Sequence, residues 1–108
     1  MTLADVRALI LGHDGVAECQ HHGKPDFRVN ERIVVNLDEC ERTITVKLDI
    51  ARQALLVASL PPDVVSLPGG WAKYGWTTIS FERAPSELIR ELITNAVRVA
   101  PKRAARRK

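Results

Sequence analysis

Apolar residues recur at every second position in the middle of the chain, and this alternation constrains the fold more than any other feature. It runs through residues 33–37 and 43–48, and a shorter stretch at residues 27–29 precedes them. A period of two is typical of a β-strand with one face against a core. The connections are short and polar, whereas parallel strands need long crossovers. The sequence therefore predicts an antiparallel meander, whose inward residues are Ile33, Val35, Leu37, Ile44, Val46 and Leu48.

Turn-forming residues mark the ends of these strands and of two more. Residues 23–26 and 30–31 have turn chemistry, and the polar block at 38–42 indicates a hairpin connection. A polar run at residues 16–22 is the candidate first strand, and residues 75–82 contain the last one. In the last strand Trp76 faces away from Thr77 and Ile79. We expect Trp76 to be a core residue, because aromatic side chains dominate core burial.

A helical period replaces the alternation in three places. Thr2 and Asp5 have the spacing of a capping box at the start of a helix over residues 2–11. Asp49 can cap a second helix over residues 50–60, whose predicted apolar stripe is Ile50, Ala54, Leu55 and Ala58. Pro85 suits the start of a third helix, whose apolar side is Leu88, Leu92, Ile93, Ala96, Val97 and Ala100. Residues 61–70 contain three prolines and two glycines, so we expect an irregular segment there.

The length and the charge of the chain limit its class. A chain of 108 residues, 45% of them apolar, can bury one core. The net charge of +3 is unevenly distributed, because five cations lie in the last eight residues. Removing these five from the 16 basic residues leaves 11 against 13 acidic ones, a net charge of −2 for residues 1–100. We therefore expect one α+β domain at residues 1–100 and a basic, disordered tail at residues 101–108.

No catalytic or metal-binding constellation is recognisable. Cys19 and His21 would share one face of a strand beside His22, but their spacing matches no standard zinc site. Polar residues of a solvated edge strand explain the cluster, and nothing around Cys19 resembles the surroundings of a catalytic nucleophile. Cys19 and Cys40 are expected to be free thiols. The sequence thus predicts a protein that is not an enzyme and has no cofactor.

The chain also lacks the pattern of a membrane protein. No apolar run approaches the ~20 residues that cross a bilayer. The first eleven residues carry Asp5 and Arg7 within an apolar stretch, which indicates a helix of the domain and not a signal peptide. We therefore expect a cytoplasmic protein without membrane contact.

Four segments carry a resemblance to a known family. They are the capped helix at residues 2–11, the segment Phe27-Arg28-Val29-Asn30-Glu31-Arg32-Ile33, the strand Tyr74-Gly75-Trp76-Thr77-Thr78-Ile79, and the helix that begins at Glu87. In this order they resemble the MmcQ/YjbR family of small bacterial proteins. The resemblance implies a frataxin-like arrangement, in which helices pack on one face of an antiparallel sheet. It also implies DNA binding, which is commonly assigned to members, and it brings no catalytic residues.

Two functions follow as hypotheses. The first is DNA binding, with phosphate contacts from the body cations Arg28, Arg32, Lys47 and Lys73 and from the tail cations Lys102, Arg103, Arg106 and Arg107. The acidic balance of the body predicts that such binding is weak or depends mostly on the tail. The second is a protein- or ligand-interaction module that uses Trp71 and Tyr74, next to a flexible Gly-Gly pair. The expected partner is accordingly DNA or a protein.

Overall fold

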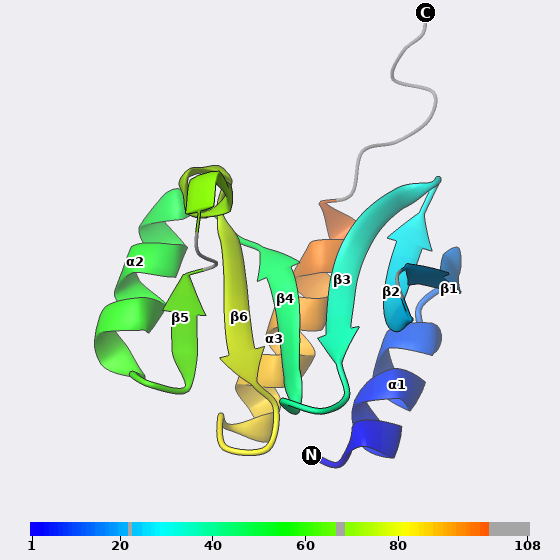
Figure 1. The fold of residues 1–108 in the computed structure, drawn as a ribbon, viewed down its shortest axis with the longest axis horizontal. Helices are drawn as coiled ribbons and strands as arrows, with labels where there is room; N and C mark the ends of the chain where they lie inside the picture. Colours follow the sequence, from blue (N-terminus) through cyan, green and yellow to red (C-terminus); the bar gives the residue numbers. More distant parts are fainter. Residues whose placement is uncertain (22, 67–68, 100–108) are drawn as a thin grey trace, which may run out of the picture.

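The structure is a computed structural model that describes residues 1–21, 23–66 and 69–99. These residues form an open six-stranded antiparallel sheet and three α-helices, α1 (Leu3–Leu11), α2 (Ile50–Ser59) and α3 (Ser86–Arg98) (Figure 1). A short 3-10 helix, η1 (Gly69–Tyr74), precedes the last strand. This is the α+β architecture that the sequence pattern predicts.

The strands follow the predicted meander. They are β1 (Val16–His21), β2 (Lys24–Val29), β3 (Arg32–Asp38), β4 (Thr43–Lys47), β5 (Val64–Ser66) and β6 (Trp76–Ser80). Their order in the sheet is β1-β2-β3-β4-β6-β5, and every neighbouring pair is antiparallel. The chain therefore reaches one edge of the sheet with β5 and then returns with β6, which lies between β4 and β5.

Two strand boundaries differ from the prediction. Lys24, Pro25 and Asp26 were expected in a turn, but they open β2 and pair with β1. A proline is tolerated there because β3 pairs with β2 only from Asp26 onward, so Pro25 has a neighbouring strand on one side. Within the segment expected to be irregular, β5 pairs with β6 and its Val64 is fully buried.

A bulge in the β2–β3 pair changes which residues of β3 face the core. Phe27 pairs with Val35 but Arg28 pairs with Ile33, so Val34 is left without a partner on β2. Val34 and Val35 are consequently both buried, whereas Ile33 is 37% exposed. The prediction that Ile33 faces the core is wrong, because the extra residue shifts the alternation by one position. The other predicted inward residues are buried: Val35, Leu37, Ile44, Val46 and Leu48.

The helices cover one face of the sheet. α3 packs against β3 and β4, and α1 contacts both α3 and β1. α2 packs against β5, and its Arg52 forms an ion pair with Glu91 of α3 (2.6 Å). The predicted capping box at the start of α1 is confirmed. The backbone N–H of Asp5 donates to the Thr2 hydroxyl (3.1 Å), and the backbone N–H of Thr2 donates to the Asp5 carboxylate (3.0 Å).

The predicted apolar stripe of α2 is wrong. Ile50 and Leu55 are 50% and 64% exposed, and Ala54 and Ala58 are exposed as well. The buried residues of this helix are Gln53 and Leu56. Gln53 faces inward because its carboxamide donates to the Trp76 carbonyl (3.1 Å) and to the Thr77 hydroxyl (3.0 Å). Hydrophobic periodicity does not predict that a polar side chain is buried with such partners.

Two smaller expectations concern the cysteines and the membrane. Cys19 and Cys40 are free thiols, as predicted. Among the residues that the structure describes, no helix is both long and apolar enough to cross a membrane.

Candidate functional site

The strands β3 and β4 separate at the end of the sheet that lies uppermost in Figure 1. Their pairing runs from Asp38–Thr43 to Val35–Val46 and stops there, whereas β4 stays paired with β6 through Lys47 and Trp76. Leu48 then donates its backbone N–H to the carbonyl of Gly75 (2.8 Å). β3 curves away from β4 in this region, while β6 remains beside it (Figure 1).

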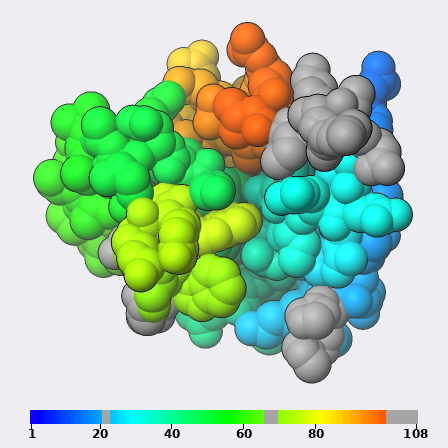
Figure 2. Space-filling model, turned by 90° about the horizontal axis from the view of Figure 1, so that it is seen from above, coloured from blue at the N-terminus to red at the C-terminus, as the bar shows by residue number. Residues whose placement is uncertain are grey.

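A cleft of about 360 Å³ opens where the two strands part. The start of β3, the end of β4, the start of β6 and the end of α3 supply its walls. The lining residues are Ile33, Val34, Lys47, Leu48, Asp49, Trp76, Asn95, Ala96 and Val99. Seen from above in Figure 2, the surface is hollowed between the orange end of α3, the cyan β2–β3 hairpin and the yellow-green η1 segment. An apolar wall with a few polar groups is typical of a ligand site.

Trp76 belongs to this cleft and not to the core. Its side chain is only half-buried, because it points to the opposite side of β6 from Thr77 and Ile79, which are fully buried. The core prediction for Trp76 is wrong because the described helices cover only the other face of the sheet. Its indole N–H has no hydrogen-bond partner within residues 1–21, 23–66 and 69–99.

A second hollow adjoins the cleft and shares Ile33, Lys47 and Trp76 with it. Arg28, Glu31 and Arg32 complete its lining. Three of the four predicted body cations, Arg28, Arg32 and Lys47, are thus brought to one end of the sheet. The β2–β3 turn makes this possible, since Asn30 and Glu31 both have positive φ (53° and 69°), as a two-residue hairpin turn requires.

The site cations differ in how far their charge is neutralised. Arg28 forms an ion pair with Asp26 (2.9 Å), whose side chain is 1% exposed, and this bond raises the pKa of Arg28 above its ordinary value. Arg32 and Lys47 are exposed and have no ion pair to any residue in the described part of the chain.

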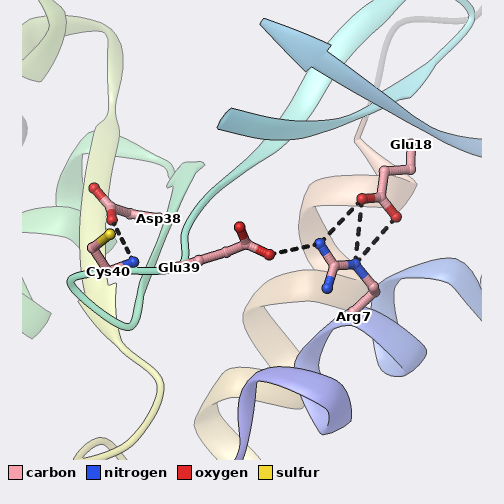
Figure 3. A network of polar contacts seen from close by, with 5 residues as sticks. All are labelled: Arg7, Glu18, Asp38, Glu39 and Cys40. Atoms are coloured by element: carbon pink, nitrogen blue, oxygen red, sulfur yellow. Dashed lines mark hydrogen bonds and ion pairs between the residues drawn. The ribbon is translucent and has the colours of Figure 1, made fainter. Parts of the chain in front are cut away.

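Most other cations on the described surface are paired. Figure 3 shows Arg7 of α1 bound to Glu18 of β1 and to Glu39 of the β3–β4 turn (3.2 and 3.0 Å). Ion pairs likewise hold Lys24, Arg42, Arg52 and Arg83. The free charge of Arg32 and Lys47 is therefore not a general property of this surface.

The predicted aromatic surface is exposed. Trp71 and Tyr74 in η1 are 58% and 57% exposed. The Lys73 ammonium lies 5.3 Å from the centre of the Tyr74 ring, within range of a cation–π contact. Gly75, with φ 95°, connects η1 to Trp76, so the exposed aromatics stand next to the cleft in the chain. Trp71, Lys73 and Tyr74 do not themselves line it.

A comparison with family models decides which proteins this chain is related to. The YjbR model matches residues 11–98, which is well over half of the chain. This chain belongs to the YjbR family.

A structural comparison agrees with this assignment at the level of the fold. The YjbR chain is similar to the crystal structure of Deinococcus radiodurans protein DR2400, which contains a DUF419 domain, with a TM-score of 0.82 and 19% sequence identity. The similarity covers 98% of this chain and 83% of that one. A search of the curated proteins found no match. The comparisons therefore establish the family and the fold of this YjbR domain.

Several predicted residues of the YjbR domain lie outside the described part of the structure. They are the tail cations Lys102, Arg103, Arg106 and Arg107, and His22. Cys19 is half-buried in β1 and Cys40 is exposed in the β3–β4 turn. Within the described ranges, no group of three or more acidic, cysteine or histidine residues is arranged to hold a metal ion.

Sequence reasoning missed Val34, Leu48 and Asn95 as residues of a site. Val34 lines the cleft because of the bulge, and no residue type at the bulge indicates from the sequence that a bulge forms there. Asn95 lies among the apolar residues of α3, and its polarity was the one feature of the sequence that could have indicated a role in a site. In this YjbR domain it is half-buried, and its side chain has no hydrogen-bond partner among the residues described.

Proposed function

We propose that this YjbR domain is a nucleic-acid-binding module, without catalytic activity, that contacts phosphates where β3 leaves β4. The distribution of unpaired charge carries the proposal. Eleven lysines and arginines lie in the described ranges, and six of them form ion pairs. The five others are Arg32, Lys47, Lys73, Arg90 and Arg98. Arg32 and Lys47 line the hollows around Trp76, and Lys73 precedes Trp76 by three positions in the sequence.

Free cations and exposed aromatic rings are two features that favour binding of single-stranded nucleic acids. A lysine or arginine that binds a phosphate releases condensed counterions, and a carboxylate paired with that cation would repel the phosphate. Trp76, Tyr74 and Trp71 offer ring faces on which bases can stack. Lys102, the first cation of the basic tail, follows Val99 by three positions in the sequence, and Val99 lines the cleft.

A matched pair of variants tests whether the charge acts locally. Arg32→Ala and Arg90→Ala each remove one exposed, unpaired arginine, and Arg90 lies on α3 away from the cleft. The logarithm of the binding constant falls linearly with the logarithm of the salt concentration. We expect Arg32→Ala to make this slope shallower by about 1, because one phosphate contact is lost. Arg90→Ala should leave the slope unchanged. Fluorescence anisotropy with labelled single-stranded and duplex DNA, from about 50 to 200 mM salt, measures both.

Two results would contradict the proposal. One is that the full chain binds neither form of DNA at about 50 mM salt, where phosphate contacts are strongest. The other is that both variants change the slope equally, which would mean that only the total charge matters. Thermal unfolding of both variants serves as the control for folding.

The exposure of Trp71 and Tyr74 supports a second candidate, a protein-interaction surface on η1. The variant Trp71→Ala/Tyr74→Ala separates the two functions. If η1 takes part in nucleic-acid binding, this variant weakens the binding of DNA. If DNA binds with unchanged affinity, η1 takes no part in nucleic-acid binding, and this result favours the second candidate for the exposed aromatic pair.

A further inference from the structure

The cleft is lined by hydrogen-bonding side chains in addition to the cations that would contact phosphates. Asn95 and Trp76 both line it, and neither the Asn95 carboxamide nor the Trp76 indole N–H has a partner within the part of the chain that is described. The Asn95 backbone is satisfied, since its carbonyl accepts the N–H of Val99 (3.0 Å), so only the side chain is open. Both side chains are half-buried, so solvent or a ligand can still reach their polar groups. A ligand that enters the cleft can therefore pair with them.

The shape and the charges of the cleft limit this ligand. Val34, Leu48 and Ala96 make its wall apolar, and its volume of about 360 Å³ is at the lower end of the range for small-molecule sites. Asp49 also lines it, with one carboxylate oxygen accepting the N–H of Ala51 (3.2 Å). This negative charge opposes a phosphate inside the cleft. The cations Lys47 and Arg32 attract a phosphate to the adjoining hollow.

A nucleobase matches these features. Its flat face can stack on an indole, and its edge carries donors and acceptors that a carboxamide reads in pairs. An amino group on the base can donate to Asp49, as cytosine does to carboxylates. The phosphate of the same nucleotide would remain outside the cleft, on Lys47.

We propose that the cleft receives one unpaired base of a single-stranded nucleic acid, stacked on Trp76 with Asn95 at its edge. The inference rests on the proposed function and narrows it to single strands. A duplex must unstack and unpair a base before the base enters such a pocket, and this costs free energy that a single strand does not spend. The domain therefore prefers single strands to duplexes of the same length.

The emission of Trp76 reports the insertion directly. The chain has two tryptophans, so Trp71→Phe in the full chain leaves Trp76 as the sole tryptophan, whose emission is excited selectively at wavelengths that tyrosine does not absorb. We expect a short oligodeoxyadenylate strand to quench this emission. The same strand with abasic residues should bind about tenfold more weakly, as loss of one base–aromatic stack predicts, and should not quench.

A second pair of variants tests the role of Asn95. Asn95→Ala should weaken binding of the adenylate strand several-fold and leave binding of the abasic strand unchanged. Asn36→Ala removes the same side chain from an exposed position on β3 outside the cleft and should change neither. Thermal unfolding shows whether the variants are folded.

The outcomes separate this inference from the proposed function. Equal affinity for intact and abasic strands, or for duplex and single strand, would overturn the inserted base while leaving phosphate binding intact. Free adenosine monophosphate that binds as tightly as the strand would overturn the strand as the occupant. Failure to bind any nucleic acid at about 50 mM salt would overturn both.

Discussion

At the scale of single residues, Gly75 determines how closely β4 and β6 approach below the cleft. Its φ of 95° lies in the left-handed region, and a Cβ at this position would collide with the Leu48 carbonyl oxygen. Its carbonyl also accepts the Leu48 N–H (2.8 Å) and the Thr77 hydroxyl (2.9 Å). Both the conformation and the close approach therefore require a glycine.

A series of glycine substitutions separates these two requirements. Gly70→Ala, where a Cβ meets open space, should leave stability nearly unchanged, and Gly15→Ala, with φ 82° and open space, should cost about 1 kcal/mol. Gly75→Ala should cost more than about 3 kcal/mol, because the collision with backbone adds to the strain. Urea unfolding at neutral pH measures all three. Equal losses for Gly15→Ala and Gly75→Ala would show that the close contact is unimportant.

The residue scale is also where prediction from sequence reached its limit. The alternation correctly identified the inward face of β4, because this strand obeys a strict period of two. The alternation failed at Ile33, and helical periodicity failed at Gln53, for different reasons. A bulge moved Ile33 outward, and hydrogen bonds to Trp76 and Thr77 drew Gln53 inward. No residue of the β2–β3 pair marks the bulge, and the two partners of Gln53 lie 23 and 24 positions away in the sequence, so a local pattern contains neither cause.

At the scale of elements, the β3–β4 hairpin depends on one carboxylate. Asp38 accepts the backbone N–H groups of Cys40 (3.0 Å) and Glu41 (2.9 Å), and Lys24 binds its other oxygen (3.1 Å) (Figure 3 shows the Cys40 bond). These bonds, above all the one from Glu41, lower the pKa of Asp38 below its ordinary 3.8. The carboxylate is thus favoured in the folded state.

The lowered pKa makes the hairpin sensitive to acid. Because the unfolded chain protonates first, the stabilisation by Asp38 is complete above pH 3.8 and is lost as the pH falls through the lowered pKa. Asp38→Ala should lose about 1 kcal/mol at neutral pH and should show a shallower decline in acid. Asp14→Ala, which removes an exposed carboxylate without a described partner, should change neither. Urea unfolding from neutral pH down to about pH 2 measures the difference, and parallel declines would contradict it.

At the scale of the whole molecule, charge is separated along the chain. Residues 1–100 carry a net charge of −2 and the last eight residues carry five cations. The acidic body includes many paired carboxylates, so its charge does not describe the end of the domain where Arg32 and Lys47 are free. The net charge of residues 1–100 therefore does not reflect the positive charge at this end of the domain.

Removing the tail tests how binding is shared. A chain that ends at Ala100 should bind DNA more weakly, and its salt slope should fall by about 0.9 for each lost phosphate contact. A measurable slope should persist, and adding Arg32→Ala should reduce it further by about 1. Anisotropy over the same salt range provides the comparison. Complete loss of binding on truncation would assign all phosphate contacts to the tail.

The cleft itself was not predictable from the sequence. The meander, the three helices and the family were recognisable from local patterns and motifs. The cleft arises because β4 continues to pair with β6 after it has left β3, and this depends on the register of three strands. Trp76 was noticed for its aromatic ring, but its place on the open side of the sheet required the position of the helices.

The departure of β3 from β4 also has a consequence for how the domain can diversify. β1 pairs with β2 up to Val29, and β3 pairs with β2 from Arg32 onward, so residues inserted at Asn30-Glu31 would lengthen a surface turn between these paired segments. Lengthening a surface loop carries a small entropic penalty. A longer hairpin would add residues beside the hollow that Glu31 and Arg32 line, so the surface next to the cleft can change at a small cost in stability.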